Sequence, residues 1–205
     1  HQGHLALQQS AQPAKVTTTD LGNGLYMLQG RGGNIGVLNG PDGVFVIDSQ
    51  YADMSAANLA AIQAIGGANP TFLVNTHWHG DHTGGNVAFN ETGAMIFAHD
   101  NVRERLSTEQ TRVMNGTERV SPASDVAAWP VVTFPEKMSL HLNGQTIRLM
   151  HVPGAHTDGA TVTYFEEANV LHMGDVMSPG MFTYMVRDSR RTMNCHIAAL
   201  ACTNQ

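Results

Sequence analysis

Residues 76–86 read THWHGDHTGGN and place three histidines and one aspartate within six positions, from His77 to His82. Imidazole nitrogens and carboxylate oxygens are the ligands that a borderline metal such as zinc prefers, and close spacing lets one loop supply several of them. A single histidine lies more often on the surface or in a satisfied core. Four metal-capable side chains in so short a run therefore predict a metal site.

The segments before this cluster predict where it lies in the fold. Residues 44–48, VFVID, and residues 71–75, TFLVN, are short apolar runs typical of buried strands. Between them, apolar residues recur at helical spacing over 53–65, and Gly66-Gly67 ends the run as a C-cap would. The order strand, helix, strand predicts parallel strands joined by a right-handed crossover. The metal site is thus expected just past the carboxyl end of a parallel strand, where open α/β sheets bind ligands.

The second half of the chain has a mostly β pattern. Residues 138–152 predict a hairpin, because two alternating runs flank Asn143-Gly144, a dipeptide that favours a type I′ turn. Further strands are expected at 25–30, 34–40, 94–100, 160–165 and 170–176. This order of elements predicts an α/β fold in which two packed sheets carry helices on their outer faces.

The region between residues 101 and 130 has two parts. Residues 101–107, NVRERLS, predict a helix with Asn101 as its N-cap. Residues 108–130 show little periodicity and contain Pro122 and Pro130, so a loop over one face of the domain is expected there.

Composition limits the class of protein. The 205 residues, of which 42% are hydrophobic and 14% charged, suit one globular domain. We expect a flexible leader over residues 1–15 and a single domain over 16–205. A net charge of −6 argues against nucleic acid as a partner, and no apolar run reaches the roughly 20 residues of a membrane helix. The polar leader is what removal of an export signal would leave, so a periplasmic or secreted protein is expected.

Other side chains are needed to complete the site. A zinc site needs three or four ligands, and a catalytic one keeps a position open for water. His156 lies in a glycine-flanked loop after a strand, and Asp175 follows Gly174 where another strand ends. His196, on a predicted last helix, is a further candidate. Four histidines within or beside strands are interpreted as structural: His99, His141, His151 and His172.

Three motifs, NTHWHGDHTGGN, HVPGAHTDGA and HMGD, closely resemble those of metallo-β-lactamase-fold hydrolases. The stretch GGNIGVLNGPDGVFVIDSQ is similar to the opening strands of that family and its metal-supporting aspartate turn. The resemblance runs from about residue 20 to about 189. It implies a four-layer αβ/βα sandwich with a two-metal site at one edge of the sheets.

The resemblance also implies a role for each matching residue. It assigns to the first metal His77, His79 and His156, and to the second metal Asp81 and His82. Asp175 would bridge the two ions, as in the glyoxalase II-like branches, and Asp48 would support the site from beneath the ligands. Asp81 would also orient the nucleophile and relay a proton.

The expected cofactor is zinc, with one ion bound tightly and a second more weakly. In the family, a further strand, a helix and a histidine loop complete the second site, whereas this sequence ends at Gln205 without them. We therefore expect the domain to lack its C-terminal strand and helix, with Cys195 or His196 as possible replacement ligands. A sheet face left uncovered in this way would favour a homodimer.

The leading functional hypothesis is a zinc-dependent hydrolase of small molecules. It would use a metal-activated hydroxide on an ester, thioester, amide or β-lactam carbonyl. Three alternatives are a glyoxalase II-like thioesterase, an iron-dependent oxidoreductase similar to persulfide dioxygenases, and an inactive binding module. The exported bacterial hydrolases are the branch that the sequence resembles most.

Overall fold

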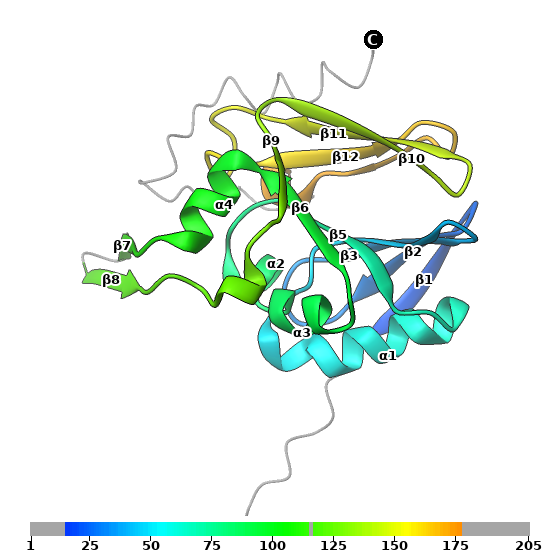
Figure 1. The fold of residues 1–205 in the computed structure, drawn as a ribbon, viewed down its shortest axis with the longest axis horizontal. Coiled ribbons are helices and arrows are strands. Elements are labelled where there is room, and N and C mark those ends of the chain that lie inside the picture. The colour runs from blue at the N-terminus through cyan, green and yellow to red at the C-terminus, as the bar shows by residue number, and fades with distance from the viewer. Residues whose placement is uncertain (1–14, 115–116, 178–205) are drawn as a thin grey trace, which may run out of the picture.

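The computed structural model describes residues 15–114 and 117–177, and in it two β-sheets pack face to face (Figure 1). The first sheet has seven strands in the order β1-β2-β3-β4-β5-β6-β9. Their bounds are β1 (Thr17–Gly22), β2 (Leu25–Gln29), β3 (Ile35–Gly40), β4 (Gly43–Ile47), β5 (Pro70–Asn75), β6 (Met95–His99) and β9 (Val132–Phe134). The strands from β1 to β4 are antiparallel to their neighbours, whereas β4, β5, β6 and β9 run parallel.

The second sheet is antiparallel, with its four strands in chain order. Its strands are β10 (Lys137–Leu142), β11 (Gln145–His151), β12 (Thr161–Phe165) and β13 (Val170–His172). The turn between β10 and β11 confirms the predicted hairpin. Asn143 and Gly144 have φ values of 53° and 73°, as a type I′ turn requires.

Helices connect the strands, and two of them cover the outer face of the first sheet. The α-helices are α1 (Ser55–Gly66), α2 (Gly80–Thr83), α3 (Asn86–Glu91) and α4 (Asp100–Ser107). Short 3₁₀ helices are η1 (Ala52–Met54), η2 (Val126–Ala128) and η3 (Gly174–Val176). Helix α1 joins the parallel strands β4 and β5, as predicted, and Gly67 ends it with a left-handed φ of 74° and an N–H bonded to the Gln63 carbonyl.

Two apolar cores hold the layers together. Strand β4 contributes to both, because Phe45 faces the second sheet while Val46 faces helices α1 and α3. Figure 1 shows these helices beneath the first sheet and strands β10 to β12 above it. A helical layer and both sheets of the predicted sandwich are thus present within residues 15–177. The expectation about a missing C-terminal strand and helix falls outside the described residues.

The structure corrects three local predictions. Residues 108–130 contain a hairpin of β7 (Gln110–Met114) and β8 (Thr117–Ser121), which projects from the domain (Figure 1). The residues of β8 are almost all exposed, so it lacks the apolar alternation by which a strand is recognised. Helix α4 is capped by His99, whose ring accepts the Asn101 N–H, and not by Asn101 itself. The strand expected at 170–176 ends at His172, where the chain turns into η3.

No helix among the described residues is long and apolar enough to cross a membrane.

The contact between the sheets makes a first prediction. Phe45 is fully buried, and its ring meets that of Phe165 edge to face with centroids 6.2 Å apart. Phe45→Ala should lower the free energy of unfolding by about 3 to 5 kcal/mol in urea denaturation, because it leaves a cavity between the sheets. Val126→Ala, at a side chain that is 69% exposed, should change it by less than about 0.5 kcal/mol. Similar losses in both variants would contradict the assignment of this core.

Candidate metal centre

Segments from both sheets meet at one end of the sandwich. Asp48 follows β4, and His77 and His79 follow the neighbouring parallel strand β5. The second sheet supplies His156 from the loop between β11 and β12, and Asp175 from η3 just after β13. Four chain segments that are distant in sequence therefore place their polar side chains in one region.

Three buried imidazoles form the first group of donors. The Nδ1 atom of His79 lies 3.2 Å from Nε2 of His77 and 2.8 Å from Nε2 of His156. Tetrahedral zinc with Zn–N bonds of about 2.0–2.1 Å would separate its nitrogen ligands by about 3.3 Å. Two of the three nitrogen pairs thus lie near the spacing that a single zinc ion requires, and all three nitrogens lie within 4.8 Å of one another, so the donor set fits such an ion.

A second group combines His77, His82 and Asp175. Oδ1 of Asp175 lies 3.3 Å from Nε2 of His82, while its Oδ2 lies 3.5 Å from Nε2 of His156. Each oxygen of this carboxylate therefore faces a different group of histidines. This is the placement that a ligand shared by two cations would need.

Asp81 belongs to neither group but lies close to the second one. It lies in the first turn of α2, and its Oδ2 is 3.6 Å from Nε2 of His82. Its side chain is 33% exposed, whereas that of His82 is 2% exposed. Asp81 is thus partly exposed beside His82, and its role as a metal ligand stays a prediction.

Asp48 fixes the ligands from below. It is fully buried; Oδ1 accepts the Thr76 N–H at 2.8 Å, and Oδ2 accepts the Thr76 hydroxyl and lies 2.7 Å from Nδ1 of His82. A carboxylate without a donor at this depth would be costly. The Nδ1–H of His82 therefore points to Asp48, which leaves Nε2 facing Asp175.

Thr76 was not predicted as part of the site. Its hydroxyl has one proton, which it donates to Asp48, so it accepts a hydrogen bond from Nδ1 of His77 at 3.1 Å. This fixes the tautomer of His77 with its Nε2 lone pair toward the donor groups. Its position directly before the histidine cluster is the signal in the sequence that could have identified it.

The acidic neighbours of His82 determine its charge. Burial alone would lower the pKa of the imidazole, but Asp48 and Asp175 outweigh burial and raise that pKa to about 10. For Asp175, burial acts to raise the pKa of the carboxyl, whereas its hydrogen bond with His82 lowers it below the usual value. The site therefore holds opposite charges that a bound cation would rearrange.

A cavity of about 550 Å³ opens beside His82 and Asp175. This volume lies within the range of small-molecule sites. Its apolar lining comes from both sheets and from the residues that flank η3, through Met27, Leu171, Met173 and Met177.

None of the remaining histidines within the described residues belongs to either donor group, although His172 lines the cavity beside His82 and Asp175. The ring of His99 stacks on that of His151 with centroids 3.8 Å apart, and its Nε2 donates to the Pro135 carbonyl. His141 lies on the exposed side of β10, and His172 contacts the Asn34 carbonyl through Nε2. Cys195 and His196, the possible replacement ligands, lie outside the described residues.

Comparison with known proteins supplies a family. The model described as the Metallo-beta-lactamase superfamily matches residues 28–189. Two curated relatives are acyl-coenzyme A thioesterase MBLAC2 of Gallus gallus, 28% identical over 181 residues, and hydroxyacylglutathione hydrolase of Methylococcus capsulatus, 29% identical over 106 residues. These matches cover 78% and 51% of this chain, but only 65% and 33% of the respective relatives.

Solved structures with the same fold include a metallo-beta-lactamase from Pontibacter korlensis, with a TM-score of 0.74 and 16% identity, covering 92% of this chain and 86% of that one. A metallo-beta-lactamase with a HARLDQ motif from Cronobacter sakazakii has a TM-score of 0.72 and 19% identity, covering 92% and 74%. At these identities the likeness concerns the fold alone. It confirms the predicted sandwich.

The raised pKa of His82 makes a second prediction. At pH 7.5 the ring of the metal-free protein carries two protons, because its pKa is about 10, and an ion bound at Nε2 must displace one of them. Saturating the metal-free protein with Zn²⁺ should therefore release close to one proton more than saturating His82→Gln. Calorimetry in buffers of different ionisation enthalpy measures this number. Equal proton release by both proteins would contradict ion binding at His82.

Proposed function

The chain belongs to the metallo-beta-lactamase superfamily, and we propose that it is a zinc-dependent hydrolase that cleaves a thioester or ester of a small molecule. The observation that carries this proposal is the carboxylate of Asp175, whose two oxygens face His82 and His156 separately. A shared carboxylate between two nitrogen donor groups suits a pair of cations.

The residues of the site would have distinct roles in metal binding and in catalysis. His77, His79 and His156 would hold one zinc ion, and His82 and Asp175 would hold the second. When bound, zinc would polarise the carbonyl of the substrate and lower the pKa of water toward about 7. Asp81, one-third exposed and 3.6 Å from His82, would orient the attacking water and accept its proton. No serine or cysteine nucleophile is required.

One argument favours zinc hydrolysis over iron oxidation. Imidazole suits zinc and iron alike, so the three histidines do not discriminate between them. The second donor group discriminates between the two hypotheses, because the oxidoreductase hypothesis needs a single iron. His82 and Asp175 could bind another ion together with His77. We therefore propose a two-ion site with zinc.

The substrate class rests on the relatives and on the cavity. Of the two curated relatives, one is named a thioesterase and the other a hydroxyacylglutathione hydrolase. Methionine and leucine side chains line the cavity beside Asp175, and such flexible apolar walls suit an acyl group. A β-lactam is the alternative substrate that the same chemistry allows.

A substrate panel tests this proposal. The protein should hydrolyse acyl thioesters or aryl esters faster than a chromogenic β-lactam, measured as kcat/KM for each. Chelation should abolish turnover, and Zn²⁺ should restore it while Fe²⁺ should not. Turnover of the lactam alone would contradict the proposed substrate class, and restoration by Fe²⁺ alone would contradict zinc.

Removing one ligand makes a sharper prediction. Loss of a partner of a metal ligand costs about 10- to 100-fold, so removing the ligand itself, as in His77→Ala, should cost activity more than about 100-fold. His141→Ala, on the exposed side of β10, is the matched control and should keep full metal content and activity. Metal analysis and kinetics measure both. Normal metal content in His77→Ala would refute this ligand set.

A further inference from the structure

We infer that Arg105 on α4 is a positioning residue that sets the spacing of the three-histidine group. The inference rests on the proposed function insofar as those histidines bind an ion. Arg105 lies outside both donor groups, and no motif singled it out. Its side chain nevertheless contacts both loops that carry the histidines.

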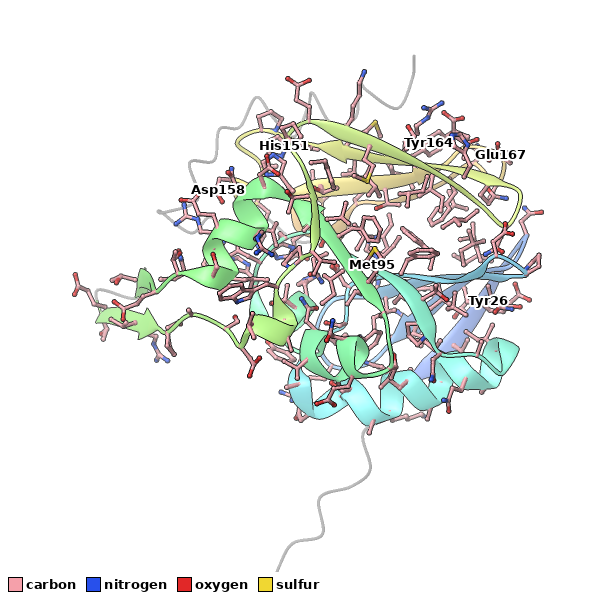
Figure 2. The ribbon with its side chains drawn as sticks, viewed as in Figure 1. Tyr26, Met95, His151, Asp158, Tyr164 and Glu167 are labelled. Atoms are coloured by element: carbon pink, nitrogen blue, oxygen red, sulfur yellow. The ribbon has the colours of Figure 1, made fainter. Side chains whose placement is uncertain are left out.

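The first contact is with the loop that carries His156. Nε and one terminal nitrogen of Arg105 lie 3.1 Å and 2.7 Å from Oδ2 of Asp158, two residues after His156. Asn101, one turn earlier on α4, donates from Nδ2 to the backbone carbonyl of Asp158 at 2.7 Å. Helix α4 thus binds both the side chain and the backbone of Asp158, which Figure 2 shows beside the helix.

The loop also packs tightly against the helix. A Cβ on Gly159 would lie 2.8 Å from Cγ2 of Val102 and 3.2 Å from its backbone nitrogen. Only glycine allows so close an approach of the two backbones. Residues 101, 102 and 105 therefore present one side of α4 to the His156 loop.

The second contact is with the loop that carries His77 and His79. The guanidinium of Arg105 lies 6.0 Å from the ring centroid of Trp78, and that ring lies 4.7 Å from the ring of His79. The other terminal nitrogen of Arg105 donates to Oε1 of Gln110 at 2.9 Å, so Gln110 fixes the guanidinium in addition to Asp158 and Trp78. Arg105 therefore joins two loops that must bring His79 and His156 together.

The Arg105–Asp158 ion pair is expected to affect the geometry of the ligands more than the stability of the domain. The side chains of Arg105 and Asp158 are 35% and 23% exposed, and a partly exposed ion pair contributes little to the free energy of unfolding. The nitrogens of His79 and His156, which are 77 residues apart in sequence, lie 2.8 Å apart. A small shift of one loop would therefore change the ligand geometry without unfolding the domain.

The test compares Arg105→Gln and Asp158→Asn with a matched control. Arg148→Gln breaks an exposed pair with Glu166 on the second sheet, away from the site. Zinc affinity is measured by competition with a chromophoric chelator, ligand geometry by the visible spectrum of the Co²⁺-loaded protein, and stability by urea unfolding of the metal-free protein.

Arg105→Gln and Asp158→Asn should both bind the more tightly held ion about 10- to 100-fold more weakly and show an altered Co²⁺ spectrum. Arg105→Lys should recover part of the affinity, because its single ammonium can still reach one oxygen of Asp158. Arg148→Gln should match the parent in both measurements, and the urea midpoints of all variants should lie close together.

Parental affinity and spectrum in Arg105→Gln and Asp158→Asn would overturn the inference. An equal loss of affinity in Arg148→Gln would also overturn it, because the effect would then not be local. A parent protein that binds metal but cleaves no substrate would refute the proposed hydrolase. In that case, weaker zinc binding by Arg105→Gln and Asp158→Asn would still support Arg105 as a positioning residue.

Discussion

The buried carboxylate of Asp48 is the constraint on which the rest of the site depends. A charge at this depth is tolerated only when donors surround it, and Thr76 and His82 provide them. Satisfying Asp48 brings the end of β4, the start of the loop after β5, and helix α2 into one arrangement. The hydrogen bond with Asp48 orients the ring of His82, and the Thr76 hydroxyl, itself bonded to Asp48, orients the ring of His77. An electrostatic requirement of folding thus also prepares the ligand geometry.

The two sheets contribute unequal parts of this arrangement. The first sheet holds Asp48 and the histidine cluster at the ends of adjacent parallel strands, so their relative positions follow from one sheet. His156 and Asp175 come from the second sheet, so their distances from His79 and His82 depend on the packing between the sheets. The contacts of helix α4 with the loop that carries His156 act on the same distances. Apolar contacts such as that of Phe45 with Phe165 therefore affect the chemistry, because a densely packed core transmits small displacements.

Helix α4 shows how residues that are not ligands can serve the site. His99 caps the helix by accepting the Asn101 N–H, which leaves the side chain of Asn101 for the Asp158 carbonyl. The ring of His99 also stacks on that of His151, which joins β6 of the first sheet to β11 of the second. Histidine thus has two uses in this protein: packing and capping around α4, and convergence of nitrogen lone pairs at the candidate metal centre.

The sequence by itself determined the local structure and the kind of chemistry. Turn residues such as Asn143-Gly144, the apolar runs of β4 and β5, and the density of donors from His77 to His82 act over a few residues, so they can be read directly. The exposed hairpin of β7 and β8 escaped prediction because burial, which creates apolar alternation, is absent there. Resemblance indicated that His156 and Asp175 belong to the site, but only the tertiary structure decided their distances, the place of Asp81 beside His82, and the link from Arg105 to Asp158. Those contacts join residues far apart in the chain, and their geometry depends on how two sheets and a helix pack, which no local pattern encodes.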